Sequence, residues 1–209
     1  ALHELGQLDE SVKSYESSLL IEPDYAQAYN NLGNVFRELG QLDDSLSCYK
    51  KSIKLDPNYA EAFFSASIIF QDLGQFEDMV EYLEQVLILK PNFSEAHNYL
   101  GSALKELGQY TKAISSYQKA LEIEPNYLEV HNNLGNAFKN NGELEKAIES
   151  YQKALTISPD YPTLHNNLGN ALKEFGEIET AIKCYKKAID INPDFADSYN
   201  NLGDAFREL

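Results

Sequence analysis

Asparagine recurs in this chain at a fixed interval of 34 residues, and its side chain offers hydrogen bonds to another molecule. The candidate binding residues of this type are Asn31, Asn34, Asn133, Asn136, Asn167, Asn170 and Asn201. A side-chain amide carries two donors and an acceptor oxygen, so it can pair with both the C=O and the N–H of a peptide bond. Regularly spaced amides therefore predict a surface that holds an extended peptide by its backbone. The alternative is that these amides bridge neighbouring helices or only hydrate the surface.

A row of basic residues follows the same period and is the second candidate for contact with a partner. It consists of Arg37, Lys105, Lys139, Lys173 and Arg207. Most of these residues are followed directly by an acidic residue, as Lys105 is by Glu106. One interpretation is a set of surface ion pairs, which contribute little to stability. The other is that the row selects the side chains of a bound peptide.

One stretch of the chain replaces asparagine with apolar residues at the corresponding places. These residues are Phe64, Ile68 and Tyr99. They predict an apolar patch that interrupts the amides and anchors an apolar residue of a partner. In the same stretch Ser67, Met79 and Val86 replace smaller residues, and such added volume is expected to push helices apart or rotate them. The alternative is drift in sequence with compensating repacking.

The period itself defines the elements that position these residues. Prolines stand at 23, 57, 91, 125, 159 and 193, and we number repeat positions from Ala26 as position 1. The complete repeats are 26–59, 60–93, 94–127, 128–161 and 162–195. In the first of these the pattern predicts a helix A over about 27–39, ended by Gly40, and a helix B over about 43–55, ended by Pro57. Each helix has one apolar stripe, so one hairpin alone cannot bury both stripes and successive hairpins must stack.

A glycine in the middle of most helices A predicts where the packing is tightest. Glycine there costs about 1 kcal/mol relative to alanine, so its recurrence at position 8 needs a compensating gain. The simplest gain is close approach of a neighbouring helix. The large residues expected opposite are the tyrosines at position 24, among them Tyr151 and Tyr185.

The repeat resembles the tetratricopeptide repeat family over the whole chain. The sequence motif of that family appears here as His131-x-x-Leu134-Gly135-x-x-Phe138, followed by Ala147, Tyr151 and Pro159. The resemblance implies an all-α solenoid of antiparallel helix hairpins stacked into a right-handed superhelix, with helices A lining the concave side. A protein–protein interaction scaffold that binds an extended peptide or partner protein in that groove is the function it favours.

Among members of the family, the repeats are most similar to the arm of O-linked N-acetylglucosamine transferase-like proteins. The chain carries Asn-Asn-Leu-Gly at 30–33, 132–135, 166–169 and 200–203. In that arm asparagines of the concave surface are understood to hold peptides, which supports the same role here. The resemblance implies an alternative function, the substrate-recognition arm of a larger glycosyltransferase. The Lys and Arg that clamp chaperone tails in other members are absent from positions 5 and 6, so such a tail is not the expected ligand.

Composition and motifs exclude several other classes. The net charge of −16 disfavours binding to nucleic-acid phosphates, and no apolar run is long enough for membrane insertion. No catalytic constellation, cofactor motif or zinc spacing is found, so the segment is not expected to be an enzyme. His97, His131 and His165 lie a whole repeat apart and are interpreted as packing residues, not metal ligands. Cys48 and Cys184 cannot meet within one chain and indicate free thiols in a reducing, cytoplasmic compartment.

The phase of the repeat at the two ends gives a last expectation. Ala1 falls in the middle of a helix A and Leu209 at the end of another. We therefore expect 1–25 to be a partial repeat (the end of helix A plus helix B) and 196–209 to be a lone helix A. Because neither end has a polar capping helix, the chain is expected to be a segment of a longer one, and its ends favour self-association.

Overall fold

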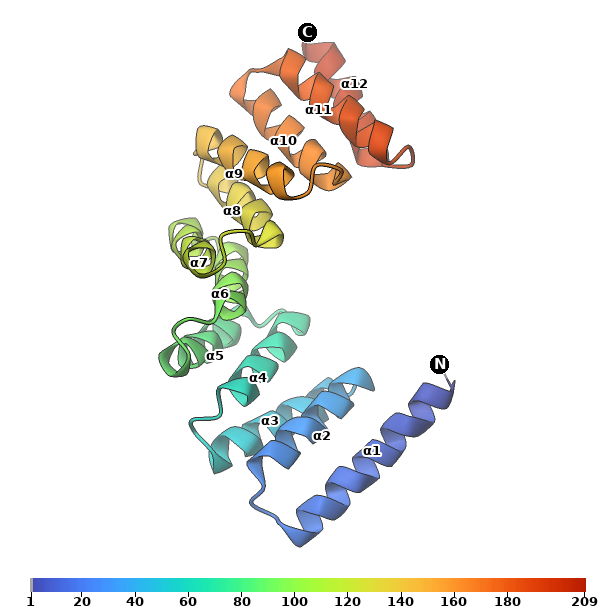
Figure 1. Ribbon diagram of the computed structural model, residues 1–209, viewed down its shortest axis with the longest axis vertical. Helices are drawn as coiled ribbons and strands as arrows, with labels where there is room; N and C mark the ends of the chain where they lie inside the picture. The colour runs from blue at the N-terminus through green and yellow to red at the C-terminus, as the bar shows by residue number, and fades with distance from the viewer. Residues whose placement is uncertain (1) are drawn as a thin grey trace. The chain divides into compact units, whose positions relative to one another are not determined.

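The described part of the chain consists of helices joined by short turns, with no β-strand (Figure 1). A computed structural model describes the backbone of residues 2–209 and the side chains of residues 7–209. The helices are α1 (Leu2–Ile21), α2 (Ala26–Glu38), α3 (Leu42–Leu55), α4 (Ala60–Asp72), α5 (Phe76–Leu89), α6 (Ser94–Glu106), α7 (Tyr110–Ile123), α8 (Leu128–Asn140), α9 (Leu144–Ile157), α10 (Pro162–Phe175), α11 (Ile178–Ile191) and α12 (Ala196–Glu208). The predicted all-α architecture is confirmed for these residues.

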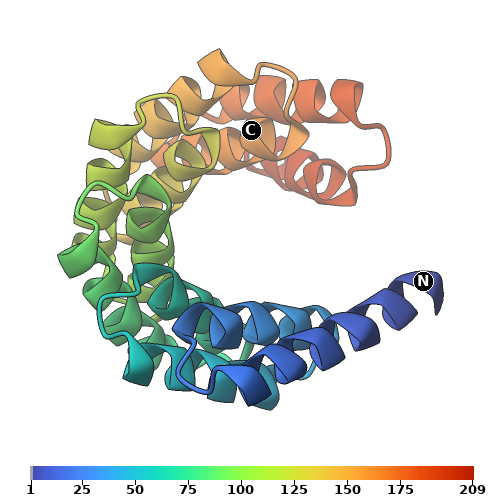
Figure 2. The ribbon, with the colours of Figure 1, turned by 60° about the horizontal axis from the view of Figure 1, so that its bottom comes forward.

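The helices pack as successive hairpins. The strongest contacts join α2 to α3, α4 to α5, α8 to α9 and α10 to α11, which are the two helices of one repeat in each case. The second helix of a repeat then packs on the first helix of the next, as α9 does on α10. The chain divides into two compact units, one ending at Ala103 and the other beginning at Leu104. Figure 2 shows the hairpins of the second unit, coloured from yellow-green to red, following one another side by side.

Glycine ends helix A in the way the sequence predicts. Gly176 follows α10 with φ of 96°, a left-handed conformation that side chains with a Cβ rarely adopt. Its backbone N–H donates to the carbonyl of Lys173, and the N–H of Glu177 donates to that of Leu172, so carbonyls at the end of the helix are paired. Gly40 lies just after the C-terminal end of α2 and is likewise left-handed, with φ of 75°. The predicted ends of helix A and helix B in repeat 26–59 are within one residue of the observed ones.

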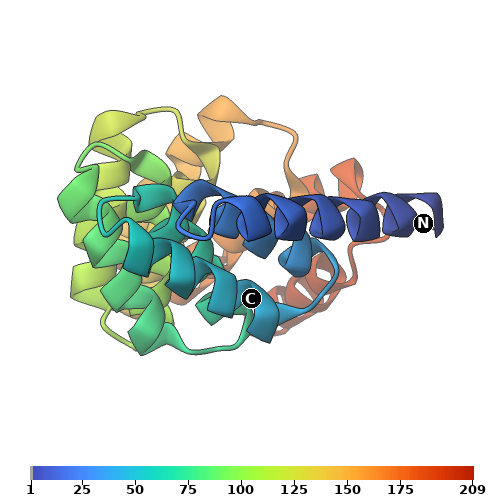
Figure 3. The same ribbon diagram turned by 90° about the horizontal axis from the view of Figure 1, so that it is seen from below.

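The first segment of the chain differs from its predicted organisation. Residues 2–21 form one continuous helix, α1, which Figure 3 shows from below. The predicted division at Gly6, with the end of a helix A before it and a helix B after it, is therefore wrong. A glycine permits a left-handed turn but does not impose one, and an uninterrupted helix keeps its own backbone hydrogen bonds.

In repeats 26–59, 128–161 and 162–195 the core of the hairpin is a glycine on helix A covered by a tyrosine of helix B. A Cβ built on Gly33 would lie 2.6 Å from Cε1 of Tyr49, and the same distance separates Gly135 from Tyr151. These tyrosine side chains are fully buried. The predicted reason for the recurring glycine, close approach of a neighbouring helix, is confirmed.

Repeat 60–93 repacks this core. Ser67 takes the place of the glycine, and Leu83 takes the place of the tyrosine. The larger Met79 and Val86 are fully buried beside Leu83, and α4 and α5 remain packed as a hairpin. The structure therefore favours compensating repacking over helices pushed apart, because volume added on one helix is offset by the smaller residue at position 24.

In the described residues, no helix combines the length and the apolar composition needed to span a membrane.

Candidate binding surface

Helices A of the second unit present a surface of amide groups that we call the helix A face. It is formed by α8, α10 and α12, and its asparagines are Asn132, Asn133, Asn136, Asn166, Asn167, Asn170, Asn200 and Asn201. These helices contact one another in sequence, α8 with α10 and α10 with α12. Glycine–tyrosine packing behind the face fixes the position of α8 on α9 and of α10 on α11.

The asparagine at position 9 is oriented by the buried tyrosine of its own repeat. The hydroxyl of Tyr151 donates to Oδ1 of Asn136 at 2.7 Å, and that of Tyr185 donates to Oδ1 of Asn170 at 2.9 Å. In the first unit Tyr49 donates to Asn34 at 2.8 Å in the same way. Burial raises the pKa of these tyrosine hydroxyls, so they keep their protons at neutral pH. Each of the three asparagines is half-buried and held in one orientation.

The asparagines at positions 5 and 6 join consecutive helices A. Nδ2 of Asn167 on α10 donates to Oδ1 of Asn132 on α8 at 3.0 Å. Nδ2 of Asn201 on α12 donates to Oδ1 of Asn166 on α10 at 2.9 Å. Asn166 is 6% exposed and also accepts a bond from Oγ of Ser198 at 3.0 Å. The structural role that the sequence left open as an alternative is therefore real at these positions.

In the first unit, α2 and α4 are not joined by the amide hydrogen bonds that connect α10 to α12. Asn30 on α2 is 5% exposed, and its Oδ1 is buried without a hydrogen-bond partner. On α4 the positions that carry Ser198 and Asn201 in α12 are Ala62 and Ser65. An alanine cannot donate, and a serine hydroxyl is shorter than an amide, so this pair of helices lacks the connection made between α10 and α12.

Aromatic rings replace the amides there. The ring of Phe64 on α4 lies with its centroid 4.9 Å from that of Phe93 and 5.4 Å from that of Tyr99 on α6. Two of the three predicted patch residues are thus in contact, and Ile68 is half-buried on the same helix. Anchoring of a partner by this patch stays a prediction.

The basic row takes part in ion pairs within the chain. Nζ of Lys105 lies 2.9 Å from Oε1 of Glu106. Nζ of Lys173 on α10 lies 3.6 Å from Oε1 of Glu208 on α12, so this pair crosses between repeats. Pairs at such exposure contribute at most about 1 kcal/mol, and a partner's charge can replace them. Arg37 and Lys139 are half-buried at the corresponding positions.

The histidines tie helix A to the preceding loop. Nε2 of His131 lies 2.8 Å from the carbonyl oxygen of Pro125, and Nε2 of His97 lies 3.0 Å from that of Pro91. His165 makes the same contact with Pro159 at 2.8 Å. His97 and His131 are buried, which agrees with the predicted packing role.

A hollow that the sequence did not predict lies away from the helix A face. It has a volume of about 660 Å³ and is lined from α7, α8 and α9 by residues that include Leu121, Leu134, Phe138, Lys146 and Lys153. None of the predicted binding residues lines it. Its polar rim comes from repeat positions that look like an ordinary charged helix surface, so the sequence carries no signal for it.

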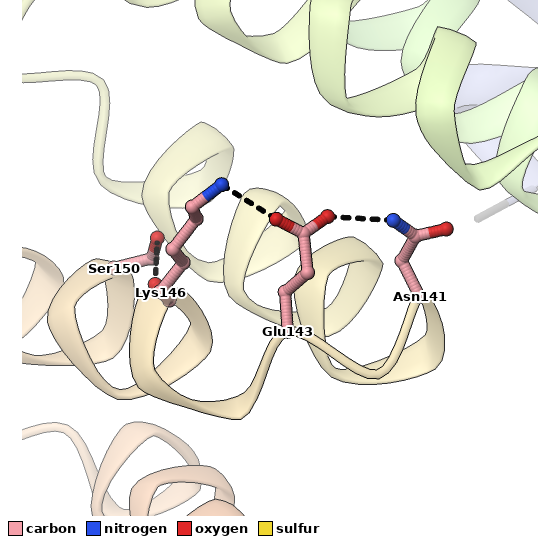
Figure 4. Close-up of polar contacts among 4 residues, drawn as sticks. All are labelled: Asn141, Glu143, Lys146 and Ser150. Carbon is pink, nitrogen blue, oxygen red and sulfur yellow. Dashed lines mark hydrogen bonds and ion pairs between the residues drawn. The ribbon is translucent and has the colours of Figure 1, made fainter.

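Lys146, which lines this hollow, belongs to a cluster of polar residues (Figure 4). Oε1 of Glu143 accepts a bond from Nδ2 of Asn141 at 2.6 Å, and Oε2 pairs with Nζ of Lys146 at 2.6 Å. The Lys146 ammonium lowers the pKa of the Glu143 carboxyl, and the carboxylate raises the pKa of Lys146. Nζ of Lys146 also lies 5.5 Å from the ring centroid of Phe138. This lysine is thus engaged within the chain.

Comparison with known proteins places the chain in a family. The sequence model described as TPR repeat matches residues 1–36, 101–142, 135–176 and 169–209. Models described as tetratricopeptide repeat match residues 26–59, 82–115 and 60–93. The chain belongs to the tetratricopeptide repeat family. No curated protein sequence matches it.

Solved structures share the fold along most of the chain. MamA is 30% identical over 79% of this chain and 96% of its own, with a TM-score of 0.76. YrrB, described as a TPR protein with an unusual peptide-binding site, is 22% identical over 95% of this chain and 100% of its own, with a TM-score of 0.80. MamA from Desulfovibrio magneticus RS-1 is 24% identical over 82% of this chain and 97% of its own, with a TM-score of 0.78. The last two likenesses show the fold alone.

Proposed function

We propose that the chain is a protein-interaction scaffold that binds an extended segment of a partner protein on the helix A face. The observation that carries the proposal is the network of hydrogen bonds among the asparagines and from the tyrosines. It orients the amides before a partner arrives, so less conformational freedom is lost on binding. The description of YrrB as having a peptide-binding site supports a peptide as the kind of partner.

The spacing of the amides suits an extended chain. Packed helices lie about 8–10 Å apart, and an extended peptide rises about 3.3 Å per residue. Amides from α8, α10 and α12 therefore meet the backbone at about every third residue of a peptide that crosses the three helices. Because an amide matches C=O and N–H groups that every residue carries, this contact is independent of peptide sequence.

Selectivity is assigned to the charged and aromatic residues beside the amides. Lys139 and Lys173 stand on the C-terminal half of their helices, one turn beyond the position-9 asparagines. Phe64, Ile68 and Tyr99 are the corresponding candidates in the first unit. The net charge of −16 disfavours nucleic acid as the partner. A non-catalytic role and a reducing compartment are part of the same proposal, and the glycosyltransferase-arm alternative stays a prediction.

The test is peptide binding by matched variants. Peptides selected from a random library on the unaltered chain are measured by fluorescence anisotropy against the triple variant Asn133→Ala, Asn167→Ala, Asn201→Ala. Three lost bonds at about 1 kcal/mol each predict about a 100-fold rise in Kd. Circular dichroism checks that the variant remains helical.

The control alters the hollow between α7 and α9 with Gln118→Ala, Glu149→Ala and Lys153→Ala, three exposed residues on its rim. The proposal predicts an unchanged Kd for this variant. Loss of binding in the rim variant, with full binding by the folded asparagine variant, would place the site on the other face and end the proposal.

A further inference from the structure

A small pocket opens beside the amides, between α8 and α10. It has a volume of about 230 Å³ and is lined by Leu128, Glu129, Asn132, Tyr161 and Leu164. Drug-sized ligands need about 300–1,000 Å³, so this pocket has room for a single side chain. Glu129 already interacts with another group of the chain. The lining that selects an occupant is therefore the aliphatic surface of the two leucines together with the tyrosine ring.

The ring in this pocket is more exposed than the aromatic residue that ends any other complete repeat. Tyr161 is 46% exposed, whereas its counterparts are half-buried, namely Tyr59, Phe93, Tyr127 and Phe195. Contact with an apolar side chain removes such surface from water, which favours binding. A second ring adds a preferred geometry, because aromatic rings attract one another in tilted and offset arrangements.

Repeat 60–93 shows which side chain packs in the corresponding place. There the position of Asn132 is taken by Phe64, and the position of Tyr161 by Phe93. The ring centroids of Phe64 and Phe93 lie 4.9 Å apart, with the two planes tilted by 47°. In repeat 128–161 the asparagine is shorter than a phenylalanine, and its Oδ1 is held by Asn167 at 3.0 Å. The space that a phenyl ring fills in one repeat is therefore open in the other.

We propose that the pocket between α8 and α10 receives an aromatic side chain, that of a phenylalanine, from the segment bound on the helix A face. This inference rests on the proposed function. The bound ring lies against Tyr161, as the ring of Phe64 lies against Phe93, and it contacts Leu128 and Leu164. The pocket thus adds a side-chain preference to a face whose amides contact the peptide backbone.

The first test uses single-residue probes that differ only in their side chain. N-acetyl-phenylalanine methylamide and its leucine and arginine counterparts are titrated into the chain with ¹³C-labelled leucine methyl groups, and the methyl signals are followed by NMR. The ring current of a bound aromatic ring shifts nearby signals, so we expect the phenylalanine compound to shift those of Leu128 and Leu164. Equal shifts from the leucine or arginine compound, or phenylalanine shifts only at other leucines, would overturn the assignment.

A variant tests the pocket by its shape. Asn132→Phe copies Phe64 and is expected to fill the space, abolishing the shifts that the phenylalanine compound causes. Asn140→Phe makes the same substitution at an exposed position at the other end of α8, and it should leave the shifts unchanged. Retained shifts in the Asn132→Phe chain, with its helix content intact by circular dichroism, would contradict the proposal. Equal losses in the two variants would contradict it as well.

Peptides selected from the random library give the second test. We expect them to share a phenylalanine at one place, and its replacement by alanine to raise Kd about tenfold. In the variant Tyr161→Ala, which lacks the ring of the pocket, the same replacement is expected to raise Kd less than about threefold. An equal rise in the unaltered and the Tyr161→Ala chains would show that the phenylalanine binds elsewhere and reject the pocket.

The two proposals fail in different ways. Peptide binding that depends on the three asparagines, by peptides that share no aromatic residue, would leave the scaffold function standing and reject the pocket. Binding of the phenylalanine compound beside Leu128 and Leu164, without any peptide on the helix A face, would do the reverse.

Discussion

Single asparagines in this chain serve the structure and the candidate site with different atoms of one side chain. Asn136 accepts from Tyr151, and Asn132 accepts from Asn167, yet both remain half-exposed at the surface. A helical wheel places positions 5, 6 and 9 on one polar side and gives no sign of which amide is buried. Asn166 is buried because Ser198 and Asn201 of the next helix reach it, and that contact depends on how the hairpins stack.

The two cysteines give a prediction at the same scale. Burial raises the pKa of the Cys184 thiol to about 11, and burial with the nearby Asp44 and Glu16 carboxylates raises that of Cys48 to about 11. A raised pKa keeps a thiol protonated until the pH approaches 11, and only the thiolate reacts. At pH 8 we expect alkylation of the native chain to be about 100-fold slower than in urea.

Mass spectrometry of iodoacetamide-treated samples over time measures this rate for each thiol. Native and unfolded chains that react equally fast would show that the thiols are not shielded by the fold.

At the scale of elements, the repeat period predicted the helices and their pairing but not every consequence of packing. Proline and glycine spacing is a local signal, and it located α2, α3 and their counterparts within about a residue. The continuous α1 could not be foreseen, because the glycine at its start resembles those that end helix A elsewhere. The hollow beside Phe138 could not be predicted from the sequence either, because residues of three helices line it and no single sequence pattern indicates it.

The glycine–tyrosine contact gives the prediction for helix packing. Gly135→Ser places a side chain where a Cβ would lie 2.6 Å from the Tyr151 ring, so the free energy of unfolding should fall by about 1–3 kcal/mol. Adding Tyr151→Leu copies the natural Ser67–Leu83 combination and is expected to recover part of the loss. Urea unfolding followed by circular dichroism measures both variants.

Gly203→Ala is the control, because no atom lies within 4 Å of a Cβ there, and it should be neutral or stabilising. A double variant no more stable than Gly135→Ser alone would refute compensation between the two positions.

At the scale of the whole molecule, the same repeat positions meet different surroundings along the chain. Phe138 on α8 is 6% exposed beneath α9, whereas Phe206, its counterpart on α12, is 53% exposed. The difference follows from the packing of α9 on α8, and self-association of the chain stays a prediction. Charge acts at this scale too, because a net charge of −16 favours partners that carry basic residues.

The central claim is that oriented amides on α8, α10 and α12 bind a partner through its backbone. The most direct measurement is the Kd of a library-selected peptide whose backbone nitrogens are methylated one at a time, compared with an alanine scan of the same peptide. We predict that methylation at about every third residue raises Kd at least tenfold, while most alanine replacements change it less than threefold. A peptide that tolerates every methylation and loses binding through its side chains alone would contradict the account.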